Sequence, residues 1–469
     1  MSLPDLIKQI LNIFKSDKQT IKSYNFNDMD TAINFWLQMF ENKPVWKSNT
    51  IQAHNLPAVI ASEFARLVTV EMKSEVTGSK RAEYIQEQYN RLLKLIRVKT
   101  ELACAGGSMI FKPYISNNKI YPDCCRADCF IPLKFDEERI TDIAFFDRIQ
   151  VGRWTYTRVE RQTFNGSEHI ITNQAFRSSD INMLGSPVSL EEVPEWANIP
   201  ESIAINNVER PLFGYFKMPF ANQIDIKSPL GVSVYSRAVN DIKNFDKQFS
   251  YYLWEFEGGQ MAIDASEDII RPAPNSSIVS KYKFKTEADK LPESRDRLFT
   301  RLFRNVNTAK DDLYQVFAPQ LRDNSYERGL DRILRQIECN CSLAYVTFSN
   351  VQNTDKTAEE VKASKHRSYS AVCDIQSALQ IALEDYIYSL DILTTAFNLA
   401  PAGKYEVSFE WGDGVLEDSI REQTVMLQEV SAGLIKKEKY LSYRYGVTEE
   451  QAKEMLPEQD TFNVNDFGV

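Results

Sequence analysis

The spacing of apolar residues predicts helices in residues 1–100 and strands in the region that follows. Apolar side chains recur every three or four positions up to Thr100, with an interruption at Thr77-Gly78. From Cys104 to about Ile205 the spacing falls towards two, and strand-rich stretches alternate with polar turns such as Asn165-Gly166. The predicted fold class is therefore α+β, with an antiparallel sheet joined to helices.

A continuous apolar stripe predicts a long helix over residues 232–257. Its members recur every three or four positions along about seven turns. Charged side chains, among them Lys243, Asp246 and Lys247, lie opposite the stripe. We expect Gly258-Gly259 to end this helix.

Two further helices are predicted on either side of a polar loop. The first spans about 326–344, and the second begins at Thr357 and runs to about Leu399. The second helix would be roughly 60 Å long, a rod that a compact enzyme domain does not need. Shorter elements predicted between and after these helices are a strand at 261–265, a strand at 404–414 and two short helices hinged at Ala432-Gly433.

Composition and charge narrow the class of protein. The chain has 469 residues, 43% of them hydrophobic, which is enough for a large folded core. The net charge of −10 argues against a surface that grips nucleic acid tightly, although an acidic wall would let a polyanion pass without sticking. No run of 18 apolar residues occurs, so we predict no membrane span, and the N-terminus lacks the apolar core of a signal peptide.

Residue types that carry catalysis or bind metals occur without the spacing that such sites need. Cys124, Cys125 and Cys129 lack the paired C-x₂-C spacing of a structural zinc site, and the odd number of cysteines favours reduced thiols. Gly106-Gly107 lies between a predicted helix and a predicted strand, which reverses the order found in phosphate-binding loops. We therefore predict no catalytic residues, no metal and no cofactor, and a protein that is not an enzyme.

Three ordered motifs carry a resemblance to a known family. They are "VERPLFGYFKMPFANQIDIKSPLGVSVYSRAVNDIKNFDKQFSYYLWEFEGG" (208–259), "TDKTAEEVKASKHRSY" (354–369) and "EVSAGLIKKEKYLSYRYGVTEEQAKEML" (429–456). In this order they resemble a portal protein of tailed bacteriophages, and more narrowly the portal branch of long-tailed phages of Gram-positive bacteria. The resemblance covers roughly residues 30–456.

The resemblance implies a phage portal fold with an α/β wing, a helical stem, a small mixed clip, a long kinked wing helix and a short helical crown. Its parts would be a wing at 1–230, a first stem helix at 231–259, a clip at 260–322, a second stem helix at 323–345, a tunnel loop at 346–356, a long wing helix and strand at 357–414, and a crown at 415–469.

For function, the resemblance implies a ring of about twelve copies at one vertex of a capsid. The terminase large subunit would drive double-stranded DNA through the ring without sequence specificity, and the DNA would later leave into the tail. The ring would also be a docking platform for head-completion or adaptor proteins and a start point for head assembly with major capsid and scaffolding proteins. The protein would be assembled in the host bacterial cytoplasm, reside in the virion and contact no membrane.

Two sets of residues are implied as functional. The tunnel loop would touch the DNA with side chains that exchange hydrogen bonds with sugar and phosphate but read no bases: Ser349, Asn350, Gln352, Asn353, Thr354, Asp355 and Lys356. The apolar stripes of the stem would bury against neighbouring subunits through Tyr235, Val239, Ile242, Phe245, Phe249, Leu330, Leu334 and Ile337. Lys243, Asp246 and Lys247 would face the lumen or pair across subunits.

Two alternatives stay open. A minor capsid or head–tail adaptor protein of the same particle would lack the tunnel loop. A cytoplasmic hydrolase with a helical domain is a more distant alternative from another class.

Overall fold

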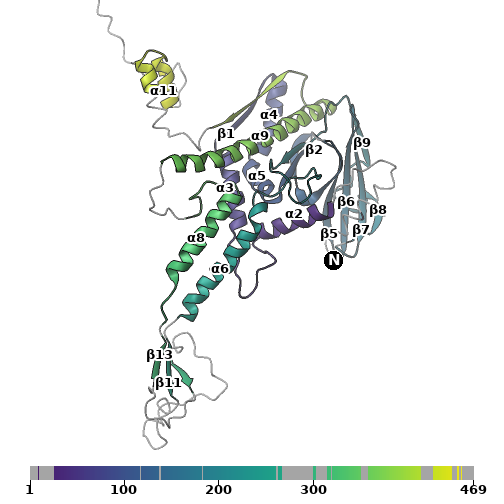
Figure 1. Ribbon diagram of the computed structural model, residues 1–469. Helices are drawn as coiled ribbons and strands as arrows, with labels where there is room; N and C mark the ends of the chain where they lie inside the picture. The colour runs from purple at the N-terminus through teal and green to yellow at the C-terminus, as the bar shows by residue number, and fades with distance from the viewer. Residues whose placement is uncertain are drawn as a thin grey trace, which may run out of the picture.

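A body of helices and sheets forms most of the molecule, and two long helices project from it (Figure 1). The computed structural model describes residues 26–116, 118–136, 139–181, 183–259, 262–266, 299–302, 314–317, 319–349, 358–412 and 426–445, together with Gln9, 452–453 and Leu456. Helices and antiparallel strands are both abundant in it, which confirms the predicted α+β class.

The long helices lie close to the predicted ranges, except that the helix predicted from residue 232 begins only at Val239. The body contains α2 (Phe26–Phe40), α3 (Leu56–Thr69), α4 (Lys80–Leu93), α5 (Ile96–Gly106) and α9 (Ala358–Ala396). The projecting pair is α6 (Val239–Gly258) and α8 (Asp323–Asn340), and α11 (Lys437–Tyr445) lies apart from the body in Figure 1. Within the described residues, no helix has the length and apolar composition needed to cross a membrane.

Antiparallel strands form the sheets of the body. The largest sheet has the order β4-β5-β6-β7-β8, with β9 also paired to β7, and a smaller sheet has the order β10-β2-β3. The strands of these two sheets are β2 (Ser108–Ser116), β3 (Lys119–Arg126), β4 (Phe130–Phe135), β5 (Ile140–Val151), β6 (Trp154–Phe164), β7 (Glu168–Ser178), β8 (Ser186–Val188), β9 (Ser202–Asn206) and β10 (Gly214–Lys217). They confirm the predicted sheet between Cys104 and Ile205.

The prediction that residues 1–100 are helical was wrong for residues 72–78, which form a strand. Strand β1 (Met72–Gly78) pairs antiparallel with β14 (Tyr405–Trp411), with Val76 opposite Val407. The strand predicted at 404–414 is confirmed by β14. Its partner β1 is rich in polar residues, and it becomes a strand because a segment far along the chain offers it a ladder of backbone hydrogen bonds.

Helix α9 crosses the smaller sheet at very close range, as Figure 1 shows for its path over β2. A Cβ atom on Gly214 of β10 would lie 2.0 Å from the carbonyl oxygen of Ala382 on α9. Only glycine lets a strand and a helix approach this closely. The neighbouring side chains of Leu379, Leu383 and Tyr386 are buried there.

Two glycines cross where the body meets the projecting helices. Gly107 ends α5 with φ 87°, a left-handed conformation that glycine adopts without strain. A Cβ atom on Gly107 would lie 2.6 Å from the carbonyl oxygen of Gly231, and one on Gly231 would lie 2.1 Å from the carbonyl oxygen of Gly107. The Ser108 Oγ also accepts a hydrogen bond from the Gly231 N–H at 2.9 Å. The pair Gly106-Gly107 therefore serves a close contact between two segments, one of which leads into α6.

A buried polar cluster joins the two main sheets. The Lys112 Nζ on β2 lies 2.9 Å from both carboxylate oxygens of Glu160 on β6, and Gln162 Nε2 donates to Glu160 at 2.6 Å. Burial alone would lower the pKa of Lys112, but the charges of Glu160 and nearby acidic groups outweigh it and raise that pKa. Because each charge has a partner, the pair is stable where either charge alone would not be.

His169, at the edge of this cluster, should make the folded protein less stable in acid. His169 is 0% exposed, its Nε2 lies 3.0 Å from Gln162 Oε1, and burial lowers its pKa from 6.5 to about 4. Well above pH 6.5 the ring is neutral in both folded and unfolded chains. As the pH falls from 6.5 towards 4, the unfolded chain binds a proton that the folded chain does not, so stability is lost in that window.

The substitution His169→Gln tests this account. Glutamine has no titrating ring and keeps an N–H that can donate to Gln162. Between pH 7 and pH 4.5 we expect the wild type to lose about 1–3 kcal/mol more unfolding free energy than the variant. Denaturant midpoints at the two pH values measure this difference, and equal losses in both proteins would contradict it.

Candidate functional site

Helices α6 and α8 lie side by side and run antiparallel, forming a hairpin that projects from the body (Figure 1). At its far end, Arg322 donates to both oxygens of Glu255 at 2.9 and 2.6 Å. At the body end, Asn340 Nδ2 donates to Asp241 Oδ2 at 2.7 Å. Polar contacts at both ends thus fix the register of helices that are about 30 Å long.

A small sheet lies beyond the far end of this hairpin (Figure 1). Its order is β12-β11-β13, from β11 (Ala262–Ser266), β12 (Phe299–Leu302) and β13 (Tyr314–Phe317). Strand β11 confirms the strand predicted at 261–265. The chain therefore leaves the body along α6, forms this sheet and returns along α8.

Five of the eight residues predicted to pack between subunits are buried within a single chain. Tyr235, Ile242, Phe245, Leu330 and Ile337 all belong to the buried core of the body and hairpin. Side chains with almost no exposed surface in one chain cannot bury further against another copy. The predicted subunit contact is therefore wrong for these five, because a stripe shows that a helix face is covered but not what covers it.

The other three members of the predicted packing set are partly exposed. Val239, Phe249 and Leu334 pack against the same core from its edge. Their role between subunits stays a prediction.

Asp246 binds a loop of its own chain and does not face a lumen. It is 2% exposed, and its carboxylate accepts hydrogen bonds from Trp46 Nε1 at 2.9 Å and from the His54 backbone N–H at 3.1 Å. The prediction that Asp246 faces a channel or a neighbouring subunit was therefore wrong. Lys243 and Lys247 are exposed, as predicted for that side of the helix.

Aromatic side chains that the stripe did not include are exposed on the far half of α6. Trp254 is 65% exposed and Tyr251 is 43% exposed. Tyr251 and Trp254 are three positions apart and so lie on one face of α6, and neighbouring exposed aromatic groups are typical of contact surfaces. The sequence shows aromatic residues at these positions, but their exposure depends on where α8 lies.

The segment after α8 contains the first predicted DNA-contacting residue. Ser349 is 6% exposed, and its hydroxyl donates to Glu338 Oε2 of α8 at 2.9 Å. Its side chain therefore points into the protein, and the prediction that it touches DNA was wrong. The remaining members of that set lie outside the described residues: Asn350, Gln352, Asn353, Thr354, Asp355 and Lys356.

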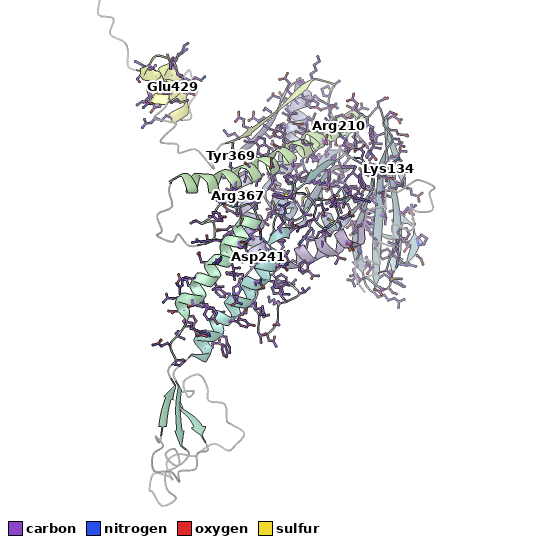
Figure 2. All side chains as sticks on the ribbon, viewed as in Figure 1. Lys134, Arg210, Asp241, Arg367, Tyr369 and Glu429 are labelled. Carbon is purple, nitrogen blue, oxygen red and sulfur yellow. The ribbon has the colours of Figure 1, made fainter. Side chains whose placement is uncertain are left out.

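The described residues offer little reactive chemistry. They contain no group of three or more His, Cys, Asp or Glu side chains that could hold a metal ion. Burial raises the pKa of both Cys124 and Cys129 to about 12, so these thiols are poor nucleophiles at neutral pH. A cavity of about 210 Å³ between α9 and β14 has polar and aromatic walls and no ionisable carboxylate or imidazole: Tyr369, Cys373, Gln376, Ser377, Gln380, Trp411 and Gly412. Figure 2 labels Tyr369 at this place.

Comparison with known proteins finds distant neighbours among solved structures only. No family model matches the sequence, and no curated protein matches it. A solved structure described as the neck of a native GTA particle computed with C12 symmetry is similar, with a TM-score of 0.43 and 9% identity over 84% of this chain and 91% of that chain. This likeness is too weak to assign the chain a fold or a function.

From its buried hydrogen bonds, we expect the Asp246 side chain to contribute strongly to the unfolding free energy of the protein. Asp246→Ala would leave the Trp46 and His54 N–H groups without their acceptor, and we expect a loss of about 2–4 kcal/mol of unfolding free energy. Lys247→Ala, one residue away and exposed, should change it by less than about 0.5 kcal/mol. Denaturant unfolding of both variants measures the effect, and similar small losses would contradict the assigned contacts.

Proposed function

We propose that this chain is a phage portal protein, a subunit of a ring through which double-stranded DNA enters and leaves a capsid. The observation that carries the proposal is the α6–α8 hairpin, which projects from an α/β body and has the sheet β12-β11-β13 at its far end (Figure 1). In the proposal the body is the wing, α6 and α8 are the stem, the small sheet is the clip and α11 belongs to the crown.

Exposed side chains of the hairpin support assembly with further copies. Ile242, Phe245, Leu330 and Ile337 of the hairpin are already covered within the chain, whereas Trp254 and Tyr251 are not. The outward side of α8 exposes Arg328 and Arg332, and a guanidinium group can stack on an aromatic ring. A head-to-tail contact between α6 of one copy and α8 of the next would repeat around a closed ring of about twelve subunits.

The charge of the chain supports passage of DNA over tight binding. At a net charge of −10 the chain as a whole repels a polyanion, and a repelled polyanion does not gain affinity by releasing counterions. The polar residues from Asn350 to Lys356 follow the hairpin in the chain, and they are the proposed points of contact with the DNA backbone. Such contacts carry no sequence preference.

The proposed partners follow from the same assignment. The sheet at the far end of the hairpin would face the terminase large subunit during DNA entry and a head-completion protein afterwards. The body would contact major capsid and scaffolding proteins in the virion. The proposed role is structural, without an enzymatic step.

Replacement of the most exposed aromatic residue tests the proposed ring. Trp254→Asp places a charge at the contact with the next copy, so we expect the fraction of protein in rings to fall at least about tenfold while the monomer stays folded. Ile226→Asp is the control, because Ile226 is 90% exposed on a loop outside the hairpin. Native mass measurement over a concentration series gives the ring fraction. Normal rings from Trp254→Asp would contradict the proposed contact.

Deletion of part of the polar segment tests the proposed DNA contact. Removing residues 350–354 should leave ring formation unchanged, because no helix or strand of the hairpin or body is removed. It should reduce the amount of DNA in particles assembled with the variant, because the proposed contacts to DNA are lost. DNA content per particle and ring formation are measured side by side. Normal DNA content would favour an adaptor or minor capsid protein, and loss of the rings would contradict the assignment of this segment.

A further inference from the structure

The chain turns sharply as it leaves α8. Ser342, with φ 60°, follows the helix, and the Leu343 N–H donates to the Glu338 carbonyl at 2.8 Å while the Ser342 N–H donates to the Cys339 carbonyl at 3.1 Å. This bond pattern closes a helix and usually takes glycine at the position of Ser342. The course of the chain after α8 is therefore defined by bonds to the last turn of that helix.

A second turn follows, and it contains a strained residue. The Thr347 hydroxyl donates to the Ala344 carbonyl at 2.6 Å, and Val346 between them has φ 75°. A branched side chain is rarely found in this left-handed region, where glycine is the usual residue. Such a conformation persists only where surrounding contacts hold it.

One buried carboxylate supplies these contacts. Glu338 is 0% exposed, and it accepts hydrogen bonds from the backbone N–H groups of Val346 at 3.3 Å, Phe348 at 2.6 Å and Ser349 at 2.9 Å. The Ser349 hydroxyl donates to it as well, at 2.9 Å. A carboxylate has about four acceptor sites, so these donors saturate it. The bonds are charge-assisted and lie away from water, which makes them strong.

Helix α9 is tied to the same place. Its Arg367 lies near the body end of α8 in Figure 2, and the Arg367 Nη1 donates to the Cys339 Sγ at 3.3 Å. The same guanidinium lies 5.8 Å from the centre of the Tyr345 ring. The last turn of α8 thus contacts both the segment that leaves it and the helix that comes next in the chain.

We propose that Glu338 is a positioning residue, which holds Tyr345–Ser349 in its strained course and so sets where the following segment starts. Because Glu338 belongs to α8, any displacement of α8 carries this starting point with it. A further consequence rests on the function proposed above. In a portal, Glu338 would couple the stem of the channel to the segment that contacts DNA. The side chain itself touches no DNA.

Backbone amide exchange tests the positioning role directly. Glu338→Gln replaces one carboxylate oxygen, an acceptor, with an NH₂ group, which can only donate. We therefore expect backbone amide exchange in the peptide that spans 344–349 to become at least about tenfold faster. Glu327→Gln is the matched control, because Glu327 is an exposed glutamate of the same helix. Ser349→Ala removes one bond to Glu338 without altering the helix, and it should give a smaller increase. Unchanged exchange in both Glu338→Gln and Ser349→Ala would overturn the proposal. If Glu338→Gln fails to fold, unchanged exchange in Ser349→Ala would overturn it.

A second measurement separates positioning from a purely structural role. Particles assembled with Glu338→Gln should contain several-fold less DNA, although the variant forms rings and unfolds within a few degrees of the wild type. Normal DNA content together with fast exchange would overturn the coupling to DNA passage. If the wild-type protein forms no ring, the proposed function fails, while the exchange experiment still decides whether Glu338 holds the segment.

Discussion

The contact between Gly107 and Gly231 is the constraint on which the rest of the structure depends. It brings the segment that leads into α6 against the end of α5 and the start of β2, at a distance that no side chain permits. The Ser233 hydroxyl and the Val234 N–H then bind the Cys104 carbonyl, which continues the attachment towards α6. The direction in which the hairpin leaves the body is therefore set inside the core, before the first turn of the helix.

From this attachment, the hairpin is built as a rigid arm of one chain. Its apolar stripes face each other and the body, Asp246 binds the loop that carries Trp46, and ion pairs and hydrogen bonds tie both ends. The surfaces left for other molecules include the side that carries Trp254, the side of α8 that exposes Arg328 and Arg332, and the small sheet beyond the hairpin. A rigid arm with one uncovered aromatic side suits repeated contact between identical copies.

The sequence predicts the elements of this fold better than their contacts. Helix α9 and the pair α6 and α8 follow from apolar spacing, because a covered helix face leaves a regular pattern whatever covers it. Strand β1 could not be predicted, since its ladder partner β14 lies far along the chain. The same limit applies to the candidate site. Tyr235 and Ile337 have the pattern of contact residues but lie in the chain's own core. The hydrogen bonds that Val346 and Phe348 donate to Glu338 correspond to no recognisable sequence pattern.

The central claim is that copies of this chain surround a channel with their α6–α8 hairpins. Cryo-electron microscopy of the purified full-length protein at high concentration tests it most directly. The account predicts closed rings in which the hairpins stand around a central opening, with Trp254 of each copy against α8 of the next. A monomer at every concentration, or rings in which the hairpins point away from the opening, would contradict it.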